Sequence, residues 1–216
     1  MSYQVKVCGL THPEDFHYCA EAGAWTGFIF HPASPRYISP EQAAAIETGS
    51  AIRVGVFVDQ GPAEVQDIMA KARLNLAQLH GGQAPDFCRS IGPERVIKVF
   101  WPQRYASPAD LAADLEKYAD SAAYFLLDAG AGGGGHGQPL DLDFLKNLRS
   151  PRPWLLAGGL KAENIKNINP ADWPGLYGFD FNSGLEQAPG IKDHNLIRAA
   201  LQAVSDLDQN QHGELS

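Results

Sequence analysis

Residues 5–30 read VKVCGLTHPEDFHYCAEAGAWTGFIF, and this stretch indicates the fold. A short apolar run at 5–8 is followed by a helical pattern at 12–22 and by a second apolar run at 26–30. Thr11 is a candidate N-cap for the helix, and Gly23 stands where a helix should stop. Strands that are joined through a helix pair in parallel. The stretch therefore predicts one strand–helix–strand unit of a parallel sheet.

The same alternation continues along the chain. Further strands are expected at 52–58, 76–80, 96–100, 124–128, 154–157 and 177–181, which makes eight in all. Further helices are expected at 40–46, 63–72, 85–91, 108–118, 140–148, 161–168 and 193–204. Ser39 and Pro40 suit a helix start, and Gly49 and Gly92 suit helix ends.

Eight such units close into a barrel more readily than they form an open sheet. We therefore predict one α/β domain, a single (βα)8 TIM barrel over residues 1–204, with a doubly wound open sheet as the alternative. Residues 205–216 are polar and aperiodic, and we expect them to form a frayed tail.

Composition limits the function. The 216 residues carry a formal net charge of −8 and no cluster of five or more Lys or Arg, so a nucleic-acid partner is disfavoured. Neither a signal peptide nor an apolar run of about 18 residues is present, so no membrane segment is expected. The three cysteines, Cys8, Cys19 and Cys88, lack metal-type spacing, which favours reduced thiols in the cytoplasm. We expect a monomer, with a homodimer as the alternative.

Candidate catalytic residues stand at strand ends. Active sites of (βα)8 barrels lie at the C-terminal ends of the strands. Cys8 ends the first predicted strand and Asp128 ends the sixth. A thiol and a carboxyl across a barrel mouth form a plausible base and acid. The alternatives are a buried, inert Cys8 and an Asp128 that only orders the loop after it.

Candidate anion-binding residues follow other strands. Gly158 and Gly159 after the seventh strand, with Ser183 and Gly184 after the eighth, suit a phosphate cradle, although they could be ordinary turn residues. Arg36 is a candidate anion clamp or a surface arginine. His80 could donate a hydrogen bond to a substrate or satisfy a turn. The seven histidines show no metal-binding spacing, so no metal is expected.

Residues 130–135 match the dinucleotide pattern G-x-G-x-x-G. No helix opens directly after them, and no acidic residue ends a strand about 20 residues later, as ribose recognition requires. We therefore predict a flexible lid here. A solvent-exposed, low-complexity loop is the alternative.

Nine strings at these strand ends resemble phosphoribosylanthranilate isomerases of tryptophan biosynthesis, in the correct order from about residue 5 to residue 203. The strings are KVCGLT (6–11), GFIF (27–30), SPRYI (34–38), VGVFV (54–58), QLHG (78–81), LLD (126–128), LAGGL (156–160), SGLE (183–186) and PGIKD (189–193). Each string is weak alone, but their order makes the resemblance specific.

The resemblance implies an Amadori rearrangement of N-(5′-phosphoribosyl)anthranilate to 1-(2-carboxyphenylamino)-1-deoxyribulose 5-phosphate, without metal or organic cofactor. It implies Cys8 as general base and Asp128 as general acid, with Arg36 facing the anthranilate carboxylate or ring. It also implies that His80 and Asp180 line the site. The phosphate of the phosphoribosyl substrate would lie on Gly158, Gly159, Ser183 and Gly184.

Two positions depart from the family pattern. Asn182 stands where a serine is frequent, and His136 stands where a hydroxyl residue is frequent. We expect phosphate binding to survive the first change, since asparagine also forms hydrogen bonds.

The alternative functions are those of a related histidine-pathway aminoaldose isomerase and of a non-catalytic phosphate-binding barrel. Cys8 favours the anthranilate substrate over the first, and an intact acid–base pair counts against the second.

Overall fold

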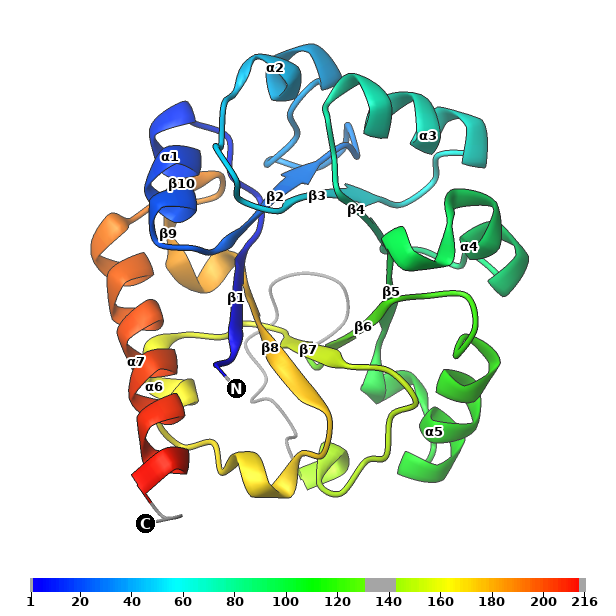
Figure 1. The fold of residues 1–216 in the computed structure, drawn as a ribbon, viewed down its shortest axis with the longest axis vertical. Coiled ribbons are helices and arrows are strands. Elements are labelled where there is room, and N and C mark those ends of the chain that lie inside the picture. Colours follow the sequence, from blue (N-terminus) through cyan, green and yellow to red (C-terminus); the bar gives the residue numbers. More distant parts are fainter. Residues whose placement is uncertain (1, 131–142, 214–216) are drawn as a thin grey trace.

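Eight parallel strands close into a barrel in chain order in the computed structural model, which describes residues 2–130 and 143–213, with side chains to residue 209 (Figure 1). The strands are β1 (Gln4–Val7), β2 (Trp25–Ile29), β3 (Arg53–Phe57), β4 (Leu76–Leu79), β5 (Val96–Phe100), β6 (Tyr124–Asp128), β7 (Trp154–Ala157) and β8 (Leu176–Phe181). Because β1 pairs with both β2 and β8, the sheet has no free edge. The predicted (βα)8 barrel is confirmed, and the open sheet is wrong.

Helices surround the strands (Figure 1). They are α1 (Pro13–Glu21), α2 (Pro40–Ala45), α3 (Pro62–Lys71), α4 (Pro85–Ile91), α5 (Pro108–Lys117), α6 (Ala162–Ile165) and α7 (His194–Gly213). The first five begin with proline, whose fixed φ suits the first helical position. At α2 the predicted start is confirmed, and Ser39 and Gln42 form a reciprocal capping box.

Three predicted helix boundaries are wrong. His12, and not Thr11, occupies the N-cap position of α1, and its side chain makes no cap; the Thr11 hydroxyl donates to the carbonyl of Gly190 at 2.6 Å. Within the described part of the predicted helix 140–148, only a 3₁₀ turn, Asp143–Leu145, is present. The helix predicted at 161–168 ends at Ile165.

The predicted tail at 205–216 is also different, because α7 continues to Gly213. Leu207 is buried, and the carboxylate of Asp208 accepts a hydrogen bond from the amide of Tyr3 at 2.9 Å. The hydrogen bond joins α7 to the residue directly before β1. A polar composition therefore concealed one buried leucine on an amphipathic helix.

The barrel interior is apolar at one end and polar at the other. Near the strand starts, the rings of Trp25, Tyr124 and Tyr177 contact one another, with centroid distances from 5.1 to 5.9 Å. Lys6 on β1 is in register with Trp25 on β2 and with Asp180 on β8. Residues in register point to the same face of a sheet, so the side chain of Lys6 lies inside the barrel, as the ring of Trp25 does. We call the aromatic end the base and the C-terminal end of the strands the mouth.

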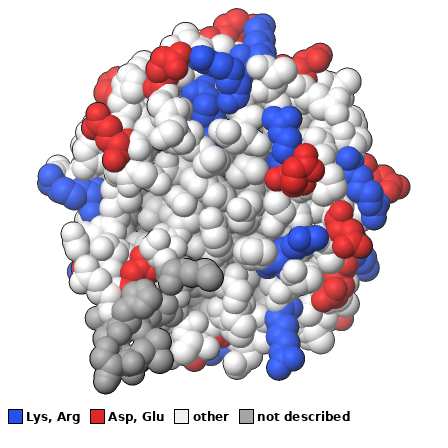
Figure 2. Space-filling view, viewed as in Figure 1, with Lys and Arg blue, Asp and Glu red and all other residues white. Residues whose placement is uncertain are grey.

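Charges on the outside are mixed. Figure 2 shows Lys and Arg interspersed with Asp and Glu around the rim of one face, whose centre is uncharged. Among residues 2–130 and 143–213, no helix is long and apolar enough to cross a membrane.

Candidate active site

Cys8 follows β1 at the barrel mouth and is 4% exposed. Lys6 points to the same face of β1 two residues earlier, and its ammonium donates to the Asp180 carboxylate at 2.8 Å. Burial opposes a charge on Lys6, but Asp180 and Cys8 outweigh it and raise the Lys6 pKa, so this lysine is cationic. Burial raises the pKa of the Cys8 thiol, while Lys6 acts in the opposite direction. The predicted thiol therefore has a buried cation beside it.

Asp128 ends β6 and lies close to His80. Its Oδ2 is 3.8 Å from Nε2 of His80, and its Oδ1 accepts a hydrogen bond from the amide of Gly130 at 3.1 Å. Burial raises the Asp128 pKa, which favours the protonated acid. The structure thus brings together two residues that the sequence placed on different strands.

His80 is neutral at physiological pH, since burial and nearby cations lower its pKa to about 4. Gln78 lies on the same face of β4, with its amide nitrogen 3.3 Å from Nδ1 of His80. His80 therefore presents a neutral ring, rather than a cation, to Asp128.

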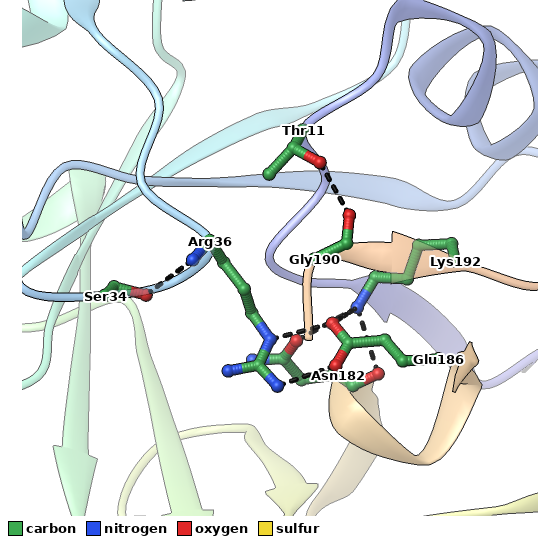
Figure 3. A network of polar contacts seen from close by, with 7 residues as sticks. All are labelled: Thr11, Ser34, Arg36, Asn182, Glu186, Gly190 and Lys192. Carbon is green, nitrogen blue, oxygen red and sulfur yellow. Dashed lines mark hydrogen bonds and ion pairs between the residues drawn. The ribbon is translucent and has the colours of Figure 1, made fainter. Parts of the chain in front are cut away.

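Arg36 is paired within the chain. Its Nε and Nη2 donate to the two carboxylate oxygens of Glu186 at 2.7 and 2.6 Å (Figure 3). Glu186 begins a hairpin of β9 (Glu186–Ala188) and β10 (Ile191–Lys192), which the sequence analysis did not predict. The Lys192 ammonium donates to Glu186 at 2.8 Å and to the carbonyl and side-chain oxygens of Asn182 at 3.0 Å each.

The predicted phosphate residues lie on two loops in contact. A side chain at Gly158 would place its Cβ 2.1 Å from the amide nitrogen of Gly130, and one at Gly184 would come within 1.9 Å of the carbonyl of Leu160. These two glycines therefore serve close backbone packing. Gly159 and Ser183 are exposed and remain the better candidates for contact with an anion.

Four residues of this site had no predicted role: Lys6, Gln78, Glu186 and Lys192. The spacing of two between Lys6 and Cys8 could have identified the first, because strand residues i and i+2 share a face. Of the predicted lid at 130–135, residues 131–135 lie outside the described residues, as does His136. Among the residues described, no group of three or more His, Cys, Asp or Glu could hold a metal ion.

A parallel (βα)8 barrel with a thiol, a carboxyl and cationic side chains at its mouth defines a class, the barrel enzymes that use acid–base chemistry on anionic small molecules. Comparison with known proteins gives the particular family. Residues 5–203 match the family model described as N-(5′phosphoribosyl)anthranilate (PRA) isomerase. The chain belongs to this family, as its sequence predicted.

Relatives agree over nearly the whole length. The N-(5′-phosphoribosyl)anthranilate isomerase of Desulfovibrio desulfuricans is 51% identical, covering 96% of this chain and 98% of the relative. The crystal structure of the Thermotoga maritima phosphoribosyl anthranilate isomerase is 34% identical, with a TM-score of 0.83 over 96% of this chain and 100% of that one. Another isomerase structure, in complex with reduced 1-(o-carboxyphenylamino)-1-deoxyribulose 5-phosphate, is also 34% identical, with a TM-score of 0.76 and the same coverage.

Proposed function

We propose that this chain converts N-(5′-phosphoribosyl)anthranilate to 1-(2-carboxyphenylamino)-1-deoxyribulose 5-phosphate, with Asp128 as general acid and Cys8 as general base. The observation that carries the assignment is that a thiol and a carboxyl with different neighbours stand at one barrel mouth. Cys8 has the cation of Lys6 beside it, whereas Asp128 lies in a site that favours its protonated form.

Asp128 performs the first step. Burial raises its pKa and so favours the protonated acid, whose proton goes to the ribose ring oxygen. The bond between that oxygen and C1′ then breaks, and the nitrogen lone pair forms an iminium with C1′. The polar ring of His80, with Nε2 3.8 Å from Oδ2, faces the carboxylate that Asp128 becomes.

Cys8 performs the second step. Only the thiolate of Cys8 can accept a proton, and burial disfavours this form, so Cys8 needs positive charge nearby to ionise and act as a base. Lys6 supplies one charge, and the iminium formed in the first step supplies another. Cys8 then removes the C2′ proton, and the C–H electron pair gives an enolamine that tautomerises to the ketone. The iminium itself acidifies the C–H bond, so the proposed chemistry needs no cofactor.

The remaining residues bind the ends of the substrate. We assign the anthranilate carboxylate to Arg36, and the phosphate to the exposed amides near Gly159 and Ser183. Asp180 lines the site and fixes Lys6. The free cysteines are consistent with a reducing cytoplasm, and a monomer without nucleic-acid partners remains our prediction.

The test follows anthranilate fluorescence while a phosphoribosyltransferase generates the substrate from anthranilate and phosphoribosyl pyrophosphate. We expect a fast decay with the wild-type chain, and only the spontaneous rate with Cys8→Ala. Cys88→Ala, which removes a buried thiol on α4, is the matched control and should retain activity. A folded wild-type chain that does not exceed the spontaneous rate would contradict the proposal.

A further inference from the structure

Glu186 is a buried carboxylate between two cations. Its side chain is 4% exposed, and it contacts Arg36 through both oxygens and Lys192 through one (Figure 3). Two cations and one anion leave the cluster with one excess positive charge. Such a cluster is suited to receive an anion.

Arg36 keeps one nitrogen for such an anion. Nε and Nη2 donate to Glu186. Among the described residues Nη1 has no hydrogen-bond partner, and it is not one of the fully buried polar atoms that lack a partner. A Cβ at Gly9 would lie 2.6 Å from Cδ of Arg36 and 2.7 Å from Oδ1 of Asn182. The lack of a side chain at Gly9 therefore lets the arginine lie over the turn that follows Cys8.

Lys192 connects this arginine with the phosphate loop. Its buried ammonium contacts Glu186 and also both oxygens of Asn182, the residue directly before Ser183 and Gly184. One side chain thus joins the group that holds Arg36 to the turn proposed to receive phosphate.

We propose that Glu186 and Lys192 are positioning residues that determine specificity for a substrate with two anionic ends. Glu186 orients the guanidinium of Arg36 so that Nη1 meets the carboxylate on the aromatic ring of the substrate. Lys192 sets the distance between Nη1 and the phosphate-binding turn. This inference rests on the proposed function, since it names the residues that place the two ends of that substrate.

The experiment uses one probe for each anionic end of the substrate. Anthranilate reports on the site for the carboxylate, and inorganic phosphate reports on the site for the phosphate. Dissociation constants are measured by calorimetry on the full chain, and KM and kcat are measured in parallel. We expect Glu186→Gln to weaken anthranilate and raise KM by about tenfold, the scale of a lost charged hydrogen bond, while kcat changes less. Phosphate binding should stay within about twofold, which also reports a folded site.

Lys192→Met should weaken both probes, because its ammonium contacts both halves. Glu47→Gln is the matched control, since it removes a surface ion pair with Arg73 and should change neither probe. Unchanged anthranilate binding in Glu186→Gln, or equal weakening of both probes in it, would overturn the role of Glu186. A Lys192→Met chain that binds phosphate normally would overturn the coupling. Because calorimetry needs no turnover, an inactive wild-type chain would count against the proposed function alone.

Discussion

Lys6 and Arg53 are both buried cations, but one lies at the mouth of the barrel and the other at its base. Arg53, at the start of β3, donates to the carbonyls of Ala43, Ile46 and Ala72 and to the hydroxyl of Thr48. Its guanidinium also lies 4.4 Å from the ring centroid of Phe28. All of its hydrogen-bond acceptors are neutral.

Lys6 instead contacts groups that gain or lose protons. Its ammonium binds the Asp180 carboxylate and lies beside the Cys8 thiol. Burial of a charge therefore does not by itself indicate function. Neutral acceptors at the ends of helices point to stability, whereas titratable partners at the ends of barrel strands point to chemistry.

Asp128→Asn at the mouth should have the largest effect. Without a proton to give, kcat/KM should fall by about 10³- to 10⁴-fold. The unfolding free energy at neutral pH should not fall, because burial disfavours the carboxylate that the change removes. Steady-state kinetics and urea unfolding measure the two effects, with the surface change Asp86→Asn as control. A loss of stability that parallels the loss of activity would contradict the assignment.

Arg53→Met at the base should show the opposite pattern. The carbonyls at the ends of α2 and α3 would lose their donor, and the unfolding free energy should fall by about 3 kcal/mol. The kcat of the folded enzyme should stay within about twofold. Arg73→Met, which breaks an exposed pair with Glu47, is the matched control and should cost less than about 1 kcal/mol. A large fall in kcat for Arg53→Met would contradict the assignment of stability to the base and of catalysis to the mouth.

The fold could be predicted because local patterns specify it. Each strand is a short apolar run between helices, and Gly23 and Gly92 adopt the positive φ values that helix ends favour. The failure of Thr11 to cap α1 could not be predicted, since its hydroxyl donates instead to a residue 179 positions away.

The candidate site could be predicted in part. Cys8 and Asp128 could be named as candidates because the fold fixes which end of a strand carries chemistry. The pairing of Arg36 with Glu186 was missed, because it joins residues 150 positions apart and depends on a hairpin after β8. Lys192 was missed for the same reason, since its role exists only once that hairpin has folded.

His80 should make stability at the mouth depend on pH. Its folded pKa is about 4, below the usual value near 6.5 for an unfolded chain. Between these values the unfolded chain binds a proton that the folded chain does not, so stability falls as pH falls through this window. The wild-type chain should lose up to about 3 kcal/mol relative to His80→Asn between pH 6.5 and 4. If the unfolding free energies of the two proteins changed with pH in the same way, His80 would not be a buried, neutral histidine.

Ser39→Ala, away from the mouth, should have the smallest effect. The change removes the capping box of α2 and should lower the unfolding free energy by about 1 kcal/mol. Thermal unfolding and the isomerase assay measure the outcome. Altered kinetics here would show that the helix layer and the mouth are coupled.

Lys6 favours the thiolate of Cys8 at the mouth, against the effect of burial. The most direct measurement is the pH dependence of Cys8 alkylation by iodoacetamide in the wild-type chain and in Lys6→Met, followed by mass spectrometry of the peptide that contains Cys8. We expect a midpoint at higher pH in Lys6→Met, because the cation that opposes the effect of burial is gone. A midpoint that stays in place or moves to lower pH would contradict this role of Lys6.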